Sequence, residues 1–287
     1  MGAAVSETIR AAGTGQVPPA AELLSVALEV AAEAARRIAE TPPASVRTKA
    51  HLADLVTDLD RAIEADVRDA VLALYPESGW QGEEFGASGP ADASLVWFCD
   101  PVDGTTNYAN QIGWCSFSLA AFDADGPLVG VVADPFRREI FAAARGEGAT
   151  LWRTNDEFDL ASAKKSELHA YDGDTLAGTV VTTEWLAHLP WPGMTETMAA
   201  LAEAGATVRI MGSSALSLAQ VAAGRAAACV IGVFSPIDGA AAALIAAEAG
   251  ATVTDDAGLV CLAPATGAIV AAGAGVSAAV RAARVRP

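Results

Sequence analysis

Hydrophobic residues recur at helical spacing in two segments near the start of the chain. Between Ala20 and Glu40, apolar side chains three or four positions apart predict an amphipathic helix, which a Pro-Pro pair then ends. The same period runs from about Thr57 to Tyr75 and stops at Pro76, so a second amphipathic helix is expected there. Residues 1–19 are small and polar, and they predict a flexible N-terminal arm.

The next part of the chain has the shorter hydrophobic period of strands. Turn residues such as Gly126-Pro127 separate apolar runs that predict strands at Leu95–Cys99, Cys115–Phe122, Leu128–Ala133 and Glu139–Ala144. Their hairpin spacing favours a mostly antiparallel sheet that the first two helices cover. The polar stretch 154–176 contains an acidic run, Asp156 to Asp159, which we interpret as a solvated connection rather than a site.

Strands and helices alternate in the second half of the chain. The expected elements are strands at Thr179–Thr183, Thr207–Met211 and Ala227–Val233, and helices at Thr195–Ala204, Ser214–Ala223 and Ala240–Ala249. The uncharged stretch 257–280 is broken by proline and glycine, so it predicts a turn, a buried strand and a helix rather than a membrane span. The pattern therefore predicts an α+β domain at 20–153 and an α/β domain at 154–287.

The charge balance narrows the range of partners. The chain has 35 acidic against 18 basic residues and a net charge of −17, so neither nucleic acid nor a membrane surface is expected as a partner. An anionic small-molecule substrate would be repelled as well, unless a metal ion lay between it and the protein. The 4 cysteines form no C-x-x-C pair, which indicates reduced thiols in a cytoplasmic protein.

The densest chemical signal is a carboxylate pair that follows a hydrophobic run. Asp100 and Asp103 come directly after Trp97–Cys99, and Pro101 fixes the turn between them. Gly104-Thr105-Thr106 then begins a helical turn whose free N–H groups can hold a phosphate. Carboxylates beside a phosphate favour divalent cations between the two, and an all-oxygen ligand set suits Mg²⁺. The alternative is an ordinary turn with a capped helix start.

The whole segment resembles the signature of the inositol monophosphatase family, whose superfamily includes fructose bisphosphatases and phosphoadenosine phosphatases. Further segments match in the expected order: Asp54–Asp60 with Lys49 ahead of it, Gly82-Glu83-Glu84, and Asp238 followed by Glu248-Ala249-Gly250. The resemblance covers roughly residues 20–280. It implies a layered αβαβα sandwich of the inositol monophosphatase and fructose-1,6-bisphosphatase type, a homodimer, and sensitivity to lithium.

The resemblance also implies a role for each matching residue. The implied ligands of two to three Mg²⁺ ions are Glu83, Asp100, the Val102 carbonyl, Asp103 and Asp238. The implied catalytic residues are Asp60 and Thr105, the pair that orients and deprotonates a metal-bound water, and Glu83, on which a third, weaker ion depends. The implied substrate-binding residues are Asp103, Gly104, Thr105, Gly212, Ser214 and Asp238. The segment Gly212-Ser213-Ser214 matches the substrate loop of the family, but it also fits a simple N-cap of the helix that follows.

These roles predict hydrolysis of a small phosphate monoester by in-line attack of water, without a covalent intermediate. Two positions depart from the family pattern: Ile237 replaces a tryptophan, and Ile231 replaces a glutamate that binds sugar hydroxyls in inositol phosphatases. The expected substrate is inositol 1-phosphate or a related polyol or sugar phosphate, and Ile231 counts against inositol 1-phosphate itself. The alternatives are a phosphatase for histidinol phosphate, phosphoadenosine phosphate or fructose 1,6-bisphosphate, and a non-catalytic regulator with the same fold.

Overall fold

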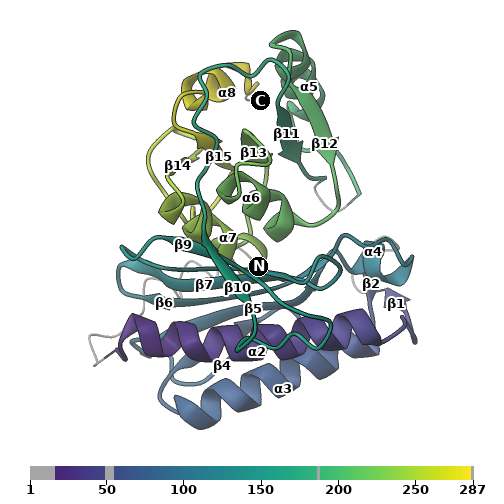
Figure 1. Cartoon of the computed structure of the whole chain (residues 1–287), viewed down its shortest axis with the longest axis vertical. Coiled ribbons are helices and arrows are strands. Elements are labelled where there is room, and N and C mark those ends of the chain that lie inside the picture. Colours follow the sequence, from purple (N-terminus) through teal and green to yellow (C-terminus); the bar gives the residue numbers. More distant parts are fainter. Residues whose placement is uncertain (1–16, 49–54, 186–187, 286–287) are drawn as a thin grey trace.

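Helices and sheets alternate in five layers (Figure 1). The computed structural model describes residues 17–48, 55–185 and 188–285. Lys49 and Asp54, which belong to the first expected motif, lie outside the described residues, as does most of the N-terminal arm. The layers confirm the fold class that the resemblance implies.

The larger sheet has eight strands in the described chain, in the order β10-β9-β8-β7-β6-β5-β3-β4. In that order the strands are Lys164–Glu167, Ala149–Arg153, Glu139–Ala144, Gly126–Asp134, Ser116–Asp123, Val96–Asp103, Gly79–Gly82 and Gly86–Ser88. Every described neighbour pair in it is antiparallel except β3 with β5. The expectation of a mostly antiparallel sheet is therefore confirmed.

Both faces of this sheet are covered by helices. Helices α2 (Ala20–Glu40) and α3 (Asp58–Leu74) pack on one face, as their apolar stripes predict. Strand β5 shows the alternation that two covered faces require: Trp97 packs into the core beneath α2 and α3, whereas Phe98 packs into the core on the other face. The short β1 (Arg47–Thr48) and β2 (Leu55–Val56) pair beside this layer.

The smaller sheet has five strands among the described residues, in the order β12-β11-β13-β15-β14. They are Thr207–Ile210, Val180–Thr183, Ala228–Ile231, Ile269–Gly273 and Ala251–Asp255. Helices α6 (Ser214–Ala222) and α7 (Pro236–Glu248) fill the layer between the two sheets, and α5 (Met194–Glu203) and α8 (Ser277–Ala283) cover the outer face (Figure 1). The strand and helix expected within 257–280 are β15 and α8.

Small residues allow α7 to lie very close to the large sheet. The buried run Ala240–Ala243 has no side chain larger than a methyl group. Opposite it, a Cβ on Gly130 of β7 would come within 2.8 Å of the backbone of Ala241. The alanines of α7 permit this close approach, which brings the start of α7 next to the large sheet.

Two sequence expectations need correction. The helix expected at Ala240–Ala249 begins at Pro236, because Ser235 takes the extended N-cap position and proline suits the first helical turn. The stretch 154–176 is not only a connection, since β10 within it pairs with β9 and extends the large sheet. The division at residue 153 therefore stays a proposal.

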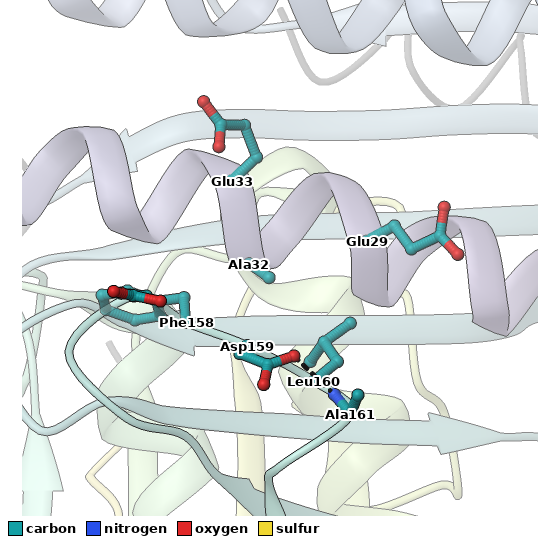
Figure 2. A pocket seen from close by; sticks show the side chains of 8 residues that line it. Glu29, Ala32, Glu33, Phe158, Asp159, Leu160 and Ala161 are labelled. Carbon is teal, nitrogen blue, oxygen red and sulfur yellow. Dashed lines mark hydrogen bonds between the residues drawn. The ribbon is translucent and has the colours of Figure 1, made fainter.

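The acidic run lies against α2. Glu157 and Asp159 line a pocket of about 260 Å³ together with Glu29 and Glu33 of α2 (Figure 2). Phe158 between them is buried in the core under that helix. The pocket includes none of the carboxylates that the motifs single out. No helix in the described ranges is both long and apolar enough to cross a membrane.

We expect Gly130→Ala to lower the free energy of unfolding by about 1–3 kcal/mol, because the added methyl group overpacks a contact with backbone atoms. Urea denaturation would measure this loss. The matched control is Gly79→Ala in β3 of the same sheet, where the nearest atom to an added Cβ is a Val96 methyl group at 3.2 Å that can shift. Equal losses in both variants would contradict the close packing of α7 on β7.

Candidate active site

The end of β5 presents two nearly buried carboxylates. The β5–β6 register shifts between Asp100 and Asp103, so the strand is irregular where they lie. The Asp100 side chain accepts a 3.0 Å hydrogen bond from the Val102 N–H, which fixes the turn through proline. Only 3 % of Asp100 and 8 % of Asp103 is exposed. These are the two positions at which the sequence motif predicted convergence.

Asp103 ties the large sheet to the start of α6. Its Oδ2 accepts hydrogen bonds from the Ser213 hydroxyl at 2.6 Å and from the Ala215 N–H at 2.7 Å. Ser213 is also the N-cap of α6, where its hydroxyl accepts the Leu216 N–H at 3.2 Å. The segment therefore caps α6, as one of the two interpretations predicts, and it also contacts Asp103, whereas its role as a substrate loop stays a prediction.

Gly104 and Gly212 bring the two halves of the site together. Gly104 has φ +93° at the start of α4 (Thr105–Ala109), and a Cβ there would lie 2.7 Å from the Gly212 carbonyl oxygen. Gly212 itself has φ +88°, and a Cβ there would lie 2.7 Å from the Asn107 amide nitrogen. Glycine is required at both positions by conformation and by space. The N-terminus of α4 thus lies against the expected substrate loop.

Asp60 and Thr105 lie in direct contact although 45 positions separate them. The Thr105 hydroxyl lies 3.1 Å from Asp60 Oδ1 and 3.0 Å from the Val102 carbonyl oxygen. The Asp60 side chain also accepts the N–H and hydroxyl of Thr57 in a capping box at the start of α3. Burial raises the pKa of Asp60 above its usual value, although the bonds from Thr57 and Thr105 oppose this. The pair is brought together as the resemblance implies.

Glu83 lies half-buried on the loop after β3, and Glu64 of α3 holds that loop in place. The Glu64 carboxylate accepts the backbone N–H groups of Glu84 at 2.6 Å and Phe85 at 3.1 Å. A Cβ on Gly82 would collide with Glu64, so glycine is needed in front of Glu83. Sequence reasoning missed Glu64, although a glutamate on the apolar face of the helix was a usable signal.

Asp238 lies half-buried in the first turn of α7, where it accepts the Ser235 hydroxyl at 3.0 Å. It lines a small cleft together with Ser214, Ile231 and Phe234. The cleft lies between α6, the end of β13 and the start of α7. The last expected metal ligand and one expected substrate residue thus share one cleft.

The carboxylates influence one another electrostatically. Burial, followed by the charges of Glu83, Asp103 and Asp238, raises the pKa of Asp100 well above its usual value. Burial raises the pKa of Asp103 to about 6, although Ser213 and neighbouring N–H groups oppose the rise. The negative charges of three carboxylates therefore disfavour ionisation of Asp100, which is almost fully buried.

This arrangement fits divalent cations by its chemistry. Every candidate donor is oxygen, which suits Mg²⁺, and buried like charges destabilise a fold unless cations pair them. Among the described residues, however, no three Asp, Glu, His or Cys side chains are already arranged as a metal-binding group. Glu83 instead acts on Asp100 through its negative charge, which raises the pKa of Asp100 further.

Glu184 is a buried carboxylate that sequence reasoning missed. It follows β11 and accepts the Gly212 N–H at 2.7 Å and the Ser217 hydroxyl at 2.6 Å. It also accepts the Met211 N–H at 3.3 Å. Burial raises its pKa to about 7, against these hydrogen bonds. Glu184 therefore holds the backbone of the expected substrate loop in place.

Comparisons with known proteins agree with this geometry. Residues 19–286 match the model of the inositol monophosphatase family. The chain is 35 % identical over 242 residues to the Nus factor SuhB of Haemophilus influenzae, covering 82 % of this chain and 86 % of that protein. It is also 35 % identical over 214 residues to an inositol-1-monophosphatase of Synechocystis, covering 73 % and 69 %. The crystal structure of the extragenic suppressor protein suhB from Bartonella henselae superposes with TM-score 0.80 at 26 % identity, covering 92 % of this chain and 99 % of that one.

The raised pKa of Glu184 predicts a pH-dependent contribution to stability. Because the folded state holds the proton more tightly, this contribution is complete below the ordinary value of 4.5 and is lost as pH rises to about 7. Relative to Glu184→Gln, which does not titrate, the wild type should lose about 3 kcal/mol of unfolding free energy over that range. Urea titrations in EDTA at several pH values would measure it. The control is Glu147→Gln in the exposed β8–β9 turn, and an equal change in both variants would contradict the assignment.

Proposed function

This chain belongs to the inositol monophosphatase family, and we propose that it is a magnesium-dependent phosphatase for a small phosphate monoester. The observation that carries the proposal is the buried Asp100 carboxylate, on which the charges of Glu83, Asp103 and Asp238 converge. A fold gains nothing from such a cluster unless cations pair it. The cluster is adjacent to the free N–H groups at the start of α4.

The residues divide into two ligand sets in this proposal. Glu83, Asp100 and the Val102 carbonyl would hold one Mg²⁺, and Asp100, Asp103 and Asp238 would hold a second. Bound Mg²⁺ supplies a Lewis acid that makes water more acidic and offsets negative charge on the ester. The hydrogen bonds from Ser213 and Ala215 to Asp103 keep that carboxylate turned toward α6.

Asp60 and Thr105 orient and deprotonate the attacking water in this proposal, while Glu83 contributes as a ligand of the metal ions. The Thr105 hydroxyl, held by Asp60 at 3.1 Å, can orient an attacking water. The raised pKa of Asp60 favours acceptance of a proton from that water. The N–H groups of Gly104 and Thr105 would receive the phosphate, because the helix start leaves them without helical partners.

The cleft beside Asp238 bears on the substrate. Ile231 and Phe234 give it apolar lining, and Ser214 lines it as well. Gly212 lies next to Ser214 and completes the substrate loop in the proposal. An apolar wall leaves polyol hydroxyls without partners, which is costly. We therefore propose a polyol, sugar or amino-alcohol phosphate that presents an apolar face to Ile231, in preference to inositol 1-phosphate.

A second candidate is a non-catalytic regulator with the same fold. The relative from Haemophilus influenzae is named as a Nus factor rather than as an enzyme, and that name favours this candidate. Magnesium binding without turnover would support it. The homodimer, the lithium sensitivity and the cytoplasmic location remain predictions.

Phosphate release with and without Mg²⁺ tests the proposed function. The panel is myo-inositol 1-phosphate, histidinol phosphate, fructose 1,6-bisphosphate, phosphoadenosine phosphate and glycerol 2-phosphate. We expect magnesium-dependent turnover that Asp103→Asn lowers at least about a hundredfold, because a ligand and its link to α6 are both weakened. Asp125→Asn, in the exposed β6–β7 turn, is the matched control. Binding of Mg²⁺ without turnover of any compound in the panel would contradict the proposed phosphatase activity.

Substitution of Ile231 tests the proposed substrate preference. Ile231→Gln should raise kcat/KM for myo-inositol 1-phosphate about tenfold or more relative to glycerol 2-phosphate, because the amide can bond hydroxyls that the wild type leaves unpaired. Ile231→Leu keeps the wall apolar and should leave the ratio unchanged. A ratio that responds equally to both variants would show that Ile231 does not contact the alcohol part of the substrate.

A further inference from the structure

Glu64 is a fully buried carboxylate to which the proposed reaction gives no role. It lies in α3 with 0 % of its surface exposed, and burial of a carboxylate is costly unless donors surround it. It accepts hydrogen bonds from the Glu84 and Phe85 amides at 2.6 and 3.1 Å, and from the Trp80 indole at 3.4 Å. Two of these donors belong to the loop that begins with Glu83. The carboxylate is therefore directed at the loop that carries an expected metal ligand.

This one carboxylate contacts the backbone on both sides of Glu83. After Glu83, its two oxygens accept the Glu84 and Phe85 N–H groups. Before Glu83, a Cβ on Gly82 would collide with the Glu64 carboxylate, which therefore packs directly against the Gly82 backbone. Hydrogen bonds to a charged acceptor are stronger than neutral ones, so the backbone around Glu83 has little freedom to rotate.

The Glu83 backbone is also joined to the strand that carries Asp100. Its N–H donates to the Cys99 carbonyl oxygen at 3.2 Å, directly after the parallel pair that Gly82 forms with Cys99. Asp100 is the next residue of β5, so this bond places Glu83 opposite Asp100 in the register. The loop is thus held by both α3 and β5 at the point where the two carboxylates meet.

A second contact from α3 reaches the side chain of Phe85. The guanidinium carbons of Arg61 and Arg68 lie 4.9 and 5.2 Å from the centroid of its ring. Arg61, Glu64 and Arg68 are three and four positions apart, so they form one row along the helix. This row contacts the loop backbone with a carboxylate and the loop side chain with two cations, and cation–π attraction stabilises such a ring.

We propose that Glu64, with Phe85 as a second anchor, is a positioning residue that sets the magnesium affinity of the candidate active site by fixing the direction of Glu83. The inference rests on the proposed function in one respect, namely that Glu83 is a ligand of Mg²⁺. A ligand that is already held in its binding direction loses less conformational freedom when the ion binds. Glu64 itself is not a ligand in this proposal, because N–H donors occupy both of its oxygens.

Calorimetric titration of the full chain with magnesium chloride, without substrate, tests this role independently of turnover. We expect Glu64→Gln to raise the dissociation constant for Mg²⁺ about tenfold or more, since the amide keeps the size of the side chain but loses its charge and one acceptor oxygen. Phe85→Leu removes the ring that the arginines contact and should raise the constant about threefold. Thermal unfolding checks the fold of each variant, and Phe85→Leu decides the outcome if Glu64→Gln does not fold.

Glu248→Gln is the matched control. Glu248 of α7 also accepts two backbone N–H groups of one turn, from Gly146 at 2.8 Å and from Gly148 at 2.9 Å. That turn joins β8 to β9 and carries no proposed metal ligand. The Mg²⁺ affinity of Glu248→Gln should therefore equal that of the wild type.

The outcomes separate this inference from the proposed function. Unchanged Mg²⁺ affinity in Glu64→Gln and Phe85→Leu, or an equal loss in Glu248→Gln, would overturn the positioning role and leave the phosphatase proposal intact. Mg²⁺ affinity that depends on Glu64, in a chain that hydrolyses no compound of the panel, would support the positioning role and contradict the phosphatase. A wild type that binds no Mg²⁺ would overturn both.

The magnesium dependence of phosphate release gives a second readout. Glu64→Gln should need about tenfold more Mg²⁺ for the half-maximal rate, with kcat at saturating Mg²⁺ within about twofold of the wild type. A purely structural role would instead lower kcat at every Mg²⁺ concentration, and that result would contradict the proposal.

Discussion

Repulsion among the carboxylates at the end of β5 is the constraint on which the rest of the site depends. Asp100 is almost fully buried within reach of three other negative charges. The protein holds its neighbours with directed donors: Ser213 bonds Asp103, and Ser235 bonds Asp238. Asp103 is thus fixed by the start of α6 and Asp238 by the N-cap of its own helix, and bound cations would offset the remaining cost of the cluster.

Close packing of the layers makes this cluster possible. Asp103 belongs to the large sheet, whereas Ser213 and Asp238 belong to the two helices between the sheets. Alanine along α7 and Gly130 on β7 let the layers approach within backbone contact. Larger side chains there would separate Asp238 from the end of β5. The alanine-rich composition therefore serves the geometry of the site as well as the core.

One loop is held from several elements of the fold. Glu184 accepts the Gly212 N–H, Gly104 packs against the Gly212 carbonyl oxygen, and Asn107 donates to the Met211 carbonyl. A loop with so many contacts has little freedom to move alone. Its position beside Asp103 therefore depends on both sheets and on α4.

Local pattern by itself determined the two N-terminal helices and the residues of the central motif. The period of apolar positions predicts α2 and α3, and a strand followed by Asp100 and Asp103 is visible in the sequence, because both depend on neighbours a few positions away. Tertiary structure alone decided the environment of Glu64 and Glu184. Their backbone partners lie 20 or more positions away in sequence, and one glutamate carries no periodic signal. Burial of such a residue is known only once the layers have packed.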